Sequence, residues 1–283
     1  MALGVLNNIS SIYAQNNLNQ TQKSLQSVLQ QLSSGSRINS GADDAAGLSL
    51  ADGLHANATA LTQSSQNANS GVGMLQTADG ALAQVTNLLD RAITLATEAA
   101  NGTLNSTQVS SANQEYQNIL TEIGNIGSTT NYNGNKVFSS SAVNIVVSDG
   151  TTAGTTTFAE TVGVLTKTSV GTTGTAGAGV DLTTNANLTA TTATAILNSL
   201  TTAVGDVAYQ RGAIGANINQ LNAAQNVADT QQVNLSSAEN DIRATNYGQA
   251  TSDMAKFQVL SQTGIAALSQ ANAVQQDILK LLQ

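Results

Sequence analysis

The sequence contains no proline, no cysteine and no tryptophan, and only 3% of its 283 residues are aromatic. Without cysteine, the chain has no disulfide and no thiolate that could act as a nucleophile or bind a metal. Without proline, the commonest helix breaker is missing, so helices can run unusually long. Few aromatic residues leave few large side chains to fill a wide core. Together these absences favour long, thin, alanine-rich helices, and we predict a mainly α fold.

Charge is also scarce, because only 9% of the residues are charged and the formal net charge is −8. Lys and Arg form no cluster, so the cationic surface that binds nucleic acid is missing, and we expect no nucleic-acid partner. No window approaches the length of apolar sequence that spans a bilayer, so we expect no membrane insertion. The first residues show no basic region or apolar run of a signal peptide, so we expect export without a cleaved signal.

The sequence offers little catalytic chemistry. His55 is the only histidine, which excludes a His-His metal site and a His-Glu-x-x-His helix within one chain. The surroundings of His55 contain no nucleophile elbow. Gly71 and Gly73 resemble the start of a dinucleotide fingerprint, but Gln76 stands at the third glycine position and no strand precedes them. We therefore predict a protein that is not an enzyme and has no cofactor, metal site or catalytic residue.

Asp43 and Asp44 are the one pair of adjacent acids, and paired carboxylates can perform acid–base chemistry or bind a cation. The structural interpretation is stronger, because both follow Ser40, a good N-cap residue. Acidic side chains in the first turn of a helix interact favourably with its dipole. We expect these two acids to mark the start of a helix.

The chain divides into three zones: Ala/Leu/Gln-rich stretches over residues 1–128 and 192–283, and a Thr/Gly-rich stretch over residues 139–191. In the middle zone, Val143–Val147 has β-strand composition and precedes a turn signal and Thr155–Phe158. Asn133-Gly134 is a second hairpin signal. We predict a small β-rich module between long helices, and we expect its Thr/Gly-rich sequence to behave as a surface loop that can be deleted.

Apolar residues at helical spacing form two sets of stripes in the flanking zones. One set predicts the seam between two paired helices: Leu75, Leu82, Val85, Leu89, Ile214, Ile218 and Leu221. The other set lies towards the two ends of the chain and predicts helices that associate with other copies: Leu18, Leu25, Leu32, Phe257, Leu260, Leu268, Ile278 and Leu281. Because these terminal stripes are sparse, we expect the terminal helices to become ordered only on assembly.

Several contiguous motifs give the sequence a specific resemblance. These motifs are Leu-Ser-Ser-Gly-Ser-Arg-Ile-Asn-Ser at 32–40, Asp-Asp-Ala-Ala-Gly-Leu at 43–48, Asn-Ala-Asn-Ser-Gly at 67–71, Met-Leu-Gln-Thr-Ala at 74–78, Tyr-Asn-Gly-Asn-Lys-Val at 132–137, Asn-Leu-Ser-Ser-Ala at 234–238, Gln-Thr-Gly at 262–264 and Gln-Ala-Asn at 270–272. Together they resemble the N- and C-terminal blocks of bacterial flagellins. The resemblance covers nearly everything except residues 139–191.

The resemblance implies a structural subunit that polymerises into the helical flagellar filament used for motility, outside the bacterial cell. It implies an inner domain of paired terminal helices lining the filament channel, formed by residues 1–40 and 240–283. A helical rod domain with a β-hairpin region is expected over 41–138 and 192–239. Residues 139–191 are expected to form a short, variable outer module.

The resemblance also implies a set of partners. The first is the chain itself, as a helical homopolymer. The others are the flagellar type III export apparatus with a secretion chaperone, and the filament cap and junction proteins. A vertebrate Toll-like receptor is a further partner, since the stretch Leu88–Leu95 is similar to the one that this receptor recognises. The residues implied at that surface are Arg91, Leu95 and Glu122, although Ile93 and Thr94 replace charged residues usual in strongly recognised members.

Two other functions fit parts of the pattern. A hook–filament junction protein of the same family shares the terminal helices, but the extent of the match at both ends favours a filament subunit. A secreted coiled-coil adhesin is an alternative from another class. It needs an export signal and usually a membrane anchor, and neither pattern is evident in the sequence.

Overall fold

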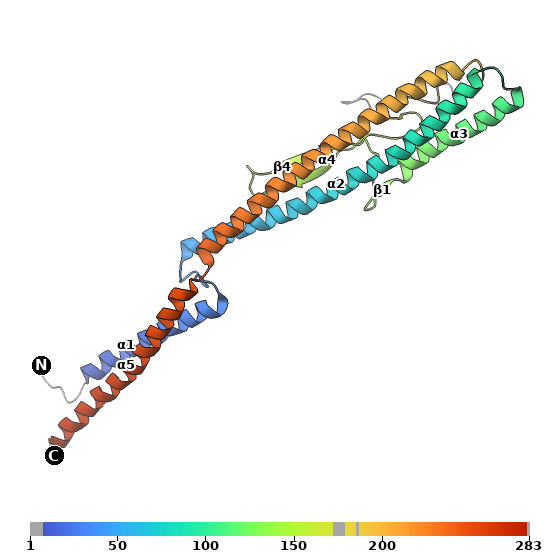
Figure 1. Ribbon diagram of the computed structural model, residues 1–283. Helices are drawn as coiled ribbons and strands as arrows, with labels where there is room; N and C mark the ends of the chain where they lie inside the picture. Colours follow the sequence, from blue (N-terminus) through green and yellow to red (C-terminus); the bar gives the residue numbers. More distant parts are fainter. Residues whose placement is uncertain (1–7, 172–178, 185–186, 282–283) are drawn as a thin grey trace. The chain divides into compact units, whose positions relative to one another are not determined.

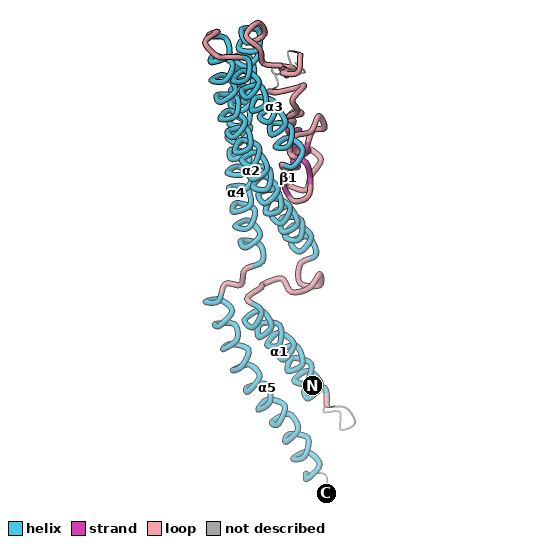
Figure 2. Tube along the Cα trace, turned by 90° about the vertical axis from the view of Figure 1, so that its right-hand side faces the viewer, coloured by secondary structure: helices cyan, strands magenta, loops and turns pink. Residues whose placement is uncertain are grey.

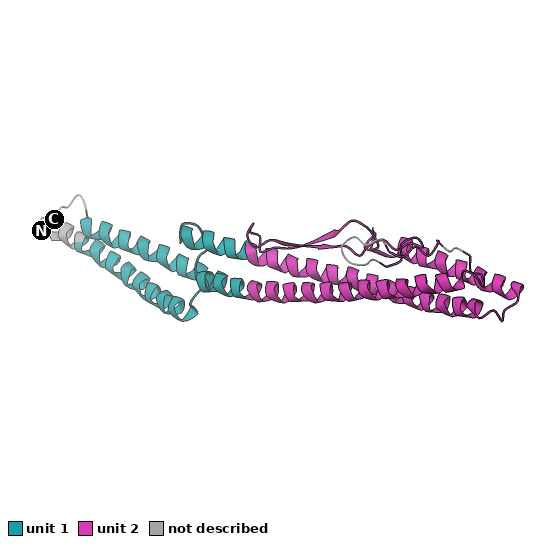
Figure 3. Cartoon of the chain, turned by 90° about the horizontal axis from the view of Figure 1, so that it is seen from above, with its two compact units in different colours: residues 1–56, 234–283 teal, residues 57–233 magenta. Residues whose placement is uncertain are grey.

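A computed structural model of the chain describes residues 8–171, 179–184 and 187–281, with the side chains of 275 and 277–281 left out. The chain divides into two compact units, residues 1–56 with 234–283 (unit 1) and residues 57–233 (unit 2) (Figure 3). The predicted mainly α fold is confirmed. Its helices are α1 (Ile9–Ser34), α2 (Ala45–Ala100), α3 (Ser106–Thr129), α4 (Ala193–Arg243) and α5 (Tyr247–Leu281).

Short polar residues and glycine define several helix ends. The Asn8 side chain accepts a hydrogen bond from Ser11 N at the start of α1, and Gly35 ends that helix with a left-handed φ of 72°. Helix α3 starts with a capping box, in which the side chains of Asn105 and Gln108 each bond the other residue's backbone N–H. These caps satisfy backbone groups that the helices themselves leave unpaired.

The start of α2 differs from the sequence prediction. Ser40 is not its N-cap, because residues 40–43 form a separate turn and the helix begins at Ala45. Asp44 takes the capping role, since its Oδ1 accepts from Gly47 N at 2.8 Å. Asp43 instead closes the preceding turn, where hydrogen bonds from the backbone of Asn39 and from Ser40 lower the pKa of its carboxyl. The sequence located the acidic helix start but assigned the cap to the wrong residue.

In unit 2, helices α2, α3 and α4 lie side by side (Figures 1 and 2). A continuous stripe of α2 is almost fully buried: Leu75, Ala78, Leu82, Val85, Leu89, Ala92, Ala96 and Ala99. The alanines of this stripe let the helices approach closely, while Leu and Val fill the space between them. From α3, Tyr116 is 1% exposed and its hydroxyl donates to the Leu182 carbonyl oxygen at 3.4 Å. Burial raises the pKa of Tyr116 to about 12.

Two antiparallel hairpins complete unit 2, as the β signals predicted. Strands β1 (Asn131–Tyr132) and β2 (Asn135–Lys136) are joined by Asn133 and Gly134, both at positive φ. This conformation is the one that an Asn-Gly hairpin turn requires. Strands β3 (Val143–Val147) and β4 (Thr156–Glu160) pair with Ile145 opposite Phe158.

The middle zone is not simply a surface loop, which corrects the sequence expectation. Several of its apolar side chains are buried in the same cluster as the helices: Ile145, Val162, Leu165, Val170, Leu182 and Leu188. Ser64 of α2 also holds the residue that follows β3, because Ser64 Oγ donates to Ser148 O and accepts from Ser148 N, at 2.7 and 2.8 Å. The Thr/Gly-rich stretch at 171–179, which the sequence predicts as an exposed loop, lies largely outside the described residues.

In unit 1, α1 and α5 lie side by side (Figures 1 and 2). The unit also contains the first turns of α2 and the last turns of α4, with the connections at residues 35–44 and 244–246. None of the helices in the described part of the chain has the length and apolar character needed to cross a membrane.

Candidate functional site

The predicted terminal stripes meet along the seam between α1 and α5. Leu18, Leu25 and Leu32 of α1 and Phe257 and Leu268 of α5 are all partly buried. Gly264 allows close approach, because a Cβ there would lie only 3.2 Å from Leu18 Cδ1. At one end of the seam, Asn8 Nδ2 donates to Ala271 O and Ser11 Oγ donates to Asn272 Oδ1, both at 2.9 Å.

The same two helices also expose apolar side chains that no described part of the chain covers. No residue of α1 is fully buried. Leu260 is 43% exposed, so it lies outside the seam that its predicted stripe partners form. The side chains of Ile278 and Leu281 lie outside the described residues. We use the term outer apolar face of unit 1 for the exposed apolar residues of α1 and α5 outside the seam, which lie on more than one side of each helix: Ile9, Ile12, Tyr13, Leu29, Val259, Leu260, Ile265 and Val274.

A backbone clasp joins the two connections of unit 1. Arg37 N donates to Arg243 O at 2.6 Å, and Thr245 N donates to Gly35 O at 3.0 Å. The guanidinium of Arg37 also donates to Ile242 O at 2.8 Å. The 35–38 connection is therefore hydrogen-bonded to the end of α4, although more than 200 residues separate them in the sequence.

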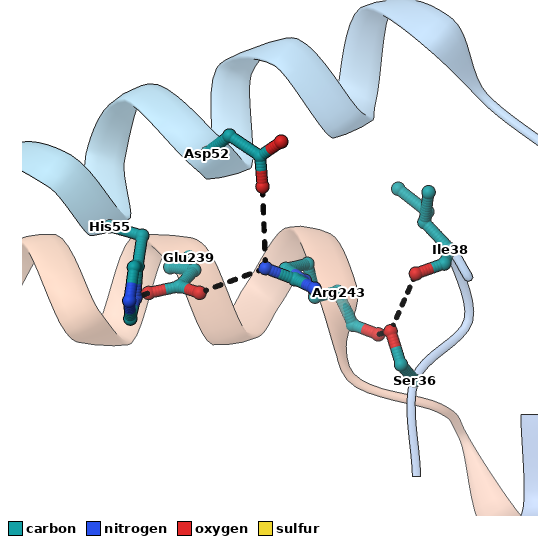
Figure 4. A network of polar contacts seen from close by, with 6 residues as sticks. All are labelled: Ser36, Ile38, Asp52, His55, Glu239 and Arg243. Atoms are coloured by element: carbon teal, nitrogen blue, oxygen red, sulfur yellow. Dashed lines mark hydrogen bonds and ion pairs between the residues drawn. The ribbon is translucent and has the colours of Figure 1, made fainter. Parts of the chain in front are cut away.

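A polar network lies beside this clasp (Figure 4). Glu239 is its centre, with one carboxylate oxygen 3.1 Å from His55 Nδ1 and the other 3.4 Å from Arg243. Arg243 also lies 3.5 Å from Asp52, while Ser36 Oγ bonds the backbone oxygens of Ile38 and Arg243. The network connects the first turns of α2 to the last turns of α4. His55 thus contributes to a structural contact rather than standing alone on a helix surface.

The predicted rod seam lies in the core of unit 2. Its members are no more than 4% exposed, apart from the partly buried Ile218: Leu75, Leu82, Val85, Leu89, Ile214 and Leu221. An ion pair spans α2 and α4 beside it, with Arg211 Nε 2.7 Å from Asp79 Oδ1. This hydrogen-bonded carboxylate raises the pKa of Arg211.

The three residues predicted for the innate-receptor surface have different environments. Arg91 is half exposed, but its guanidinium makes two hydrogen bonds to Glu115 of α3, at 2.7 and 3.1 Å. Leu95 is only 2% exposed and belongs to the core, whereas Glu122 is exposed. Arg91 pairs with Glu115, a residue that the sequence analysis did not single out. Hydrogen bonds from Arg91 lower the pKa of the Glu115 carboxyl.

The described residues contain no group of three His, Asp or Glu side chains placed to hold a metal ion. The helices α1 and α5 instead present long exposed surfaces that carry apolar side chains. The exposed apolar side chains of the outer apolar face of unit 1 suit contact with other protein surfaces, because such contact would remove them from water.

The profile of the bacterial flagellin N-terminal helical region matches residues 5–142, and that of the C-terminal helical region matches residues 197–282. The chain is 42% identical to flagellin 1 of Proteus mirabilis over 151 residues, which cover 53% of this chain and 41% of the relative. It is 44% identical to phase 1 flagellin of Salmonella naestved over 139 residues, 49% of this chain and 28% of the relative. The crystal structure of Bacillus cereus flagellin aligns with a TM-score of 0.47 at 29% identity, covering 62% of this chain and 94% of that one.

The matched part of the chain thus spans less than half the length of these Proteus and Salmonella relatives. The two family profiles nevertheless cover both long helical regions, with the unmatched residues between them coinciding with most of the Thr/Gly-rich zone. Both profiles match the regions that form the long helices described above, and we conclude that the chain belongs to the bacterial flagellin family.

Proposed function

We propose that this chain is a structural subunit that polymerises into the helical flagellar filament and has no enzymatic activity. The observation that carries the proposal is the outer apolar face of unit 1. Tyr13 is 67% exposed and Ile12 is 52% exposed, although both lie on a helix whose inner stripe already packs on α5. Large apolar side chains in this number are costly to leave in water, and contact with neighbouring copies would cover them.

The inner seam alone supplies modest stability to α1. A helix of 26 residues without a fully buried side chain has little burial to offset the entropy of ordering. Packing against other copies would bury its second face, so folding of the terminal helices and polymerisation would be coupled. This coupling supports an inner domain of residues 1–40 and 240–283. The remaining proposed domains are a rod of residues 41–138 and 192–239 and an outer module of residues 139–191.

The remaining partners follow from membership of the family. We propose export by the flagellar type III apparatus with a chaperone, without a cleaved signal peptide, and contact with the filament cap and junction proteins. A Toll-like receptor surface is proposed around Arg91, with Glu115 beside it. Leu95 is buried in unit 2, so its contribution to such a surface would be to support the helix rather than to touch the receptor.

Seeded polymerisation tests the proposal directly. Purified chain is mixed with short filament seeds, and the pellet is quantified by sedimentation and imaged by negative-stain electron microscopy. Leu260→Asp places a carboxylate on the outer apolar face, and burying it at a contact between copies would cost several kcal/mol. We expect the critical concentration to rise at least roughly tenfold, because each 1.4 kcal/mol corresponds to a factor of ten.

The matched control is Leu260→Met, which keeps the volume and apolar character of the side chain and should polymerise almost as the unchanged chain does. Circular dichroism of both variants verifies that unit 2 remains folded. Normal polymerisation of Leu260→Asp would show that this face does not contact other copies. If the unchanged chain added only a short layer to the seeds and growth then stopped, the chain would instead be a junction protein.

A further inference from the structure

An uncharged groove lies in unit 2 between helix α2, the β1–β2 hairpin and strand β3. It has a volume of about 320 Å³ and contains no acidic or basic side chain in its lining. This size is at the lower end of the range for small-molecule sites, roughly 300–1,000 Å³.

Three asparagines at the rim have amide groups available for a ligand. Asn133, Asn135 and Asn144 are exposed, and their side chains make no hydrogen bond to any other residue that the structure describes. Each amide offers two donor hydrogens and an acceptor oxygen. By contrast, Asn67 on the opposite wall is already engaged, since it donates to Val146 O at 3.1 Å and accepts from Gln63.

The floor of the groove is apolar and held in place. Met74 and Ile145 are each 6% exposed, and the partly buried Tyr132 lines the same recess. Tyr132 packs on α2 at Gly73, where a Cβ would lie 2.9 Å from the Tyr132 hydroxyl oxygen. This combination of groups suits a sugar. The C–H groups of a sugar ring can pack on the aromatic ring of Tyr132, and its hydroxyls can donate hydrogen bonds to the asparagine amides and accept them.

The free edge of β3 contributes backbone groups but is too short for a peptide strand. Backbone groups of alternate residues point to the same side of a strand, so those of Asn144 point away from β4, as those of Val146 and Ser148 do. Asn67 occupies the carbonyl of Val146, and Ser64 occupies both backbone groups of Ser148. On this edge, only the backbone groups of Asn144 and the N–H of Val146 are left without a side-chain partner. A peptide strand that added to this edge would need a longer row of unpaired backbone groups to form a continuous ladder of hydrogen bonds.

We propose that this groove binds a neutral saccharide, with Asn135 and Asn144 holding its hydroxyls and Tyr132 packing against its C–H face. The inference concerns a surface of unit 2 and does not depend on polymerisation. Binding should be weak, because the groove is open and its amides are hydrated when empty.

Saturation-transfer NMR on the full chain in solution tests this binding. The probes are methyl β-glucoside and N-acetylglucosamine, with glucuronate as the charged control. We expect transfer to the two neutral sugars and little to glucuronate. In the double variant Asn135→Ala/Asn144→Ala, the affinity for the neutral sugars should fall at least about fivefold, the effect of losing one net hydrogen bond.

Asn222→Ala is the matched control, because Asn222 is an exposed asparagine of α4 that does not line the groove. It should leave sugar binding unchanged. Equal transfer in the double variant and in the unchanged chain would overturn the proposal, as would binding of the uncharged peptide acetyl-Thr-Val-Thr-Val-amide in place of the sugars. No sugar binding together with lost seeded polymerisation of the double variant would assign the groove to contacts between copies instead.

Discussion

Ile145 of β3 lies directly over Gly71 of α2, where a Cβ would collide with the Ile145 Cδ1 atom and come within 3.2 Å of Leu221 Cδ1. The missing side chain at Gly71 thus lets the β3–β4 hairpin pack on the helix. We predict that Gly71→Ala lowers the thermal unfolding midpoint of the chain. The added Cβ would also come within 3.1 Å of Ile145 Cγ1, and Leu221 on its other side is 0% exposed, so overpacking should cost about 1–3 kcal/mol and outweigh the gain in helix propensity.

Gly80→Ala is the matched control, because Gly80 lies in the same helix and a Cβ there would meet nothing within 4 Å. With no collision, the substitution should stabilise the chain by roughly 0.5–1 kcal/mol through helix propensity alone. Calorimetry of the two variants should therefore give shifts of opposite sign. A stabilising Gly71→Ala would mean that β3 does not pack on α2 as described.

Leu82→Asp tests the seam between the rod helices. Leu82 is 0% exposed, so the carboxylate would be buried without a partner, at a cost of several kcal/mol. That cost is comparable with the whole stability of a small domain, about 5–15 kcal/mol. We expect loss of cooperative unfolding or a strongly reduced midpoint in circular dichroism, and a lower filament yield.

Gln84→Asp introduces the same charge two residues away at an exposed position of α2. Its midpoint should change little, since surface substitutions usually lie within about 0.5 kcal/mol. If both variants unfolded alike, the stripe at Leu82 would face solvent.

The buried carboxyl of Glu160 should make the stability of the folded chain depend on pH. Its side chain is 5% exposed and accepts a hydrogen bond from Asn217, and burial raises the pKa of its carboxyl. A raised folded-state pKa means that the folded chain holds this proton more tightly than the unfolded chain does. Stability is therefore lost as pH rises from the ordinary glutamate value, about 4.3, through the raised one.

Glu160→Gln removes this ionisation while keeping the shape. We expect a higher unfolding midpoint than that of the unchanged chain at neutral pH, and a difference that shrinks towards zero below about pH 4. Glu115→Gln is the control, because Arg91 lowers the pKa of the Glu115 carboxyl, the opposite direction to Glu160. Removing the Glu115 charge should therefore not raise the unfolding midpoint at neutral pH. A pH-independent effect of Glu160→Gln would show that its ionisation is not the cause.

The sequence predicted the features that depend on local spacing. The apolar stripe through Leu75 and Leu82 lies on one helical face, and Asn133-Gly134 forms a hairpin turn, because both follow from backbone geometry over a few residues. In contrast, the pairing of Arg91 with Glu115 depends on how α2 and α3 are rotated and aligned. Periodicity gives the buried face of each helix but not the axial alignment of two helices.

The middle zone shows the same limit more clearly. Its Thr/Gly-rich composition favoured a removable loop, yet Ser64 on α2 and Asn217 on α4 hold its strands, and Val162 and Leu165 are buried. Isolated apolar residues in a polar segment carry no periodic pattern, so composition could not reveal their burial. Deletion of residues 145–185 should therefore destabilise unit 2, because it removes buried side chains such as Val162 and Leu165.

The central claim is that α1 and α5 gain their stability from other copies of the chain. Amide hydrogen exchange of the monomer and of the assembled filament measures this directly. We predict rapid exchange of α1 and α5 in the monomer and strong protection of both in the filament, while residues 78–99 of α2 are protected in both states. Equal protection of α1 and α5 in monomer and filament would contradict the account.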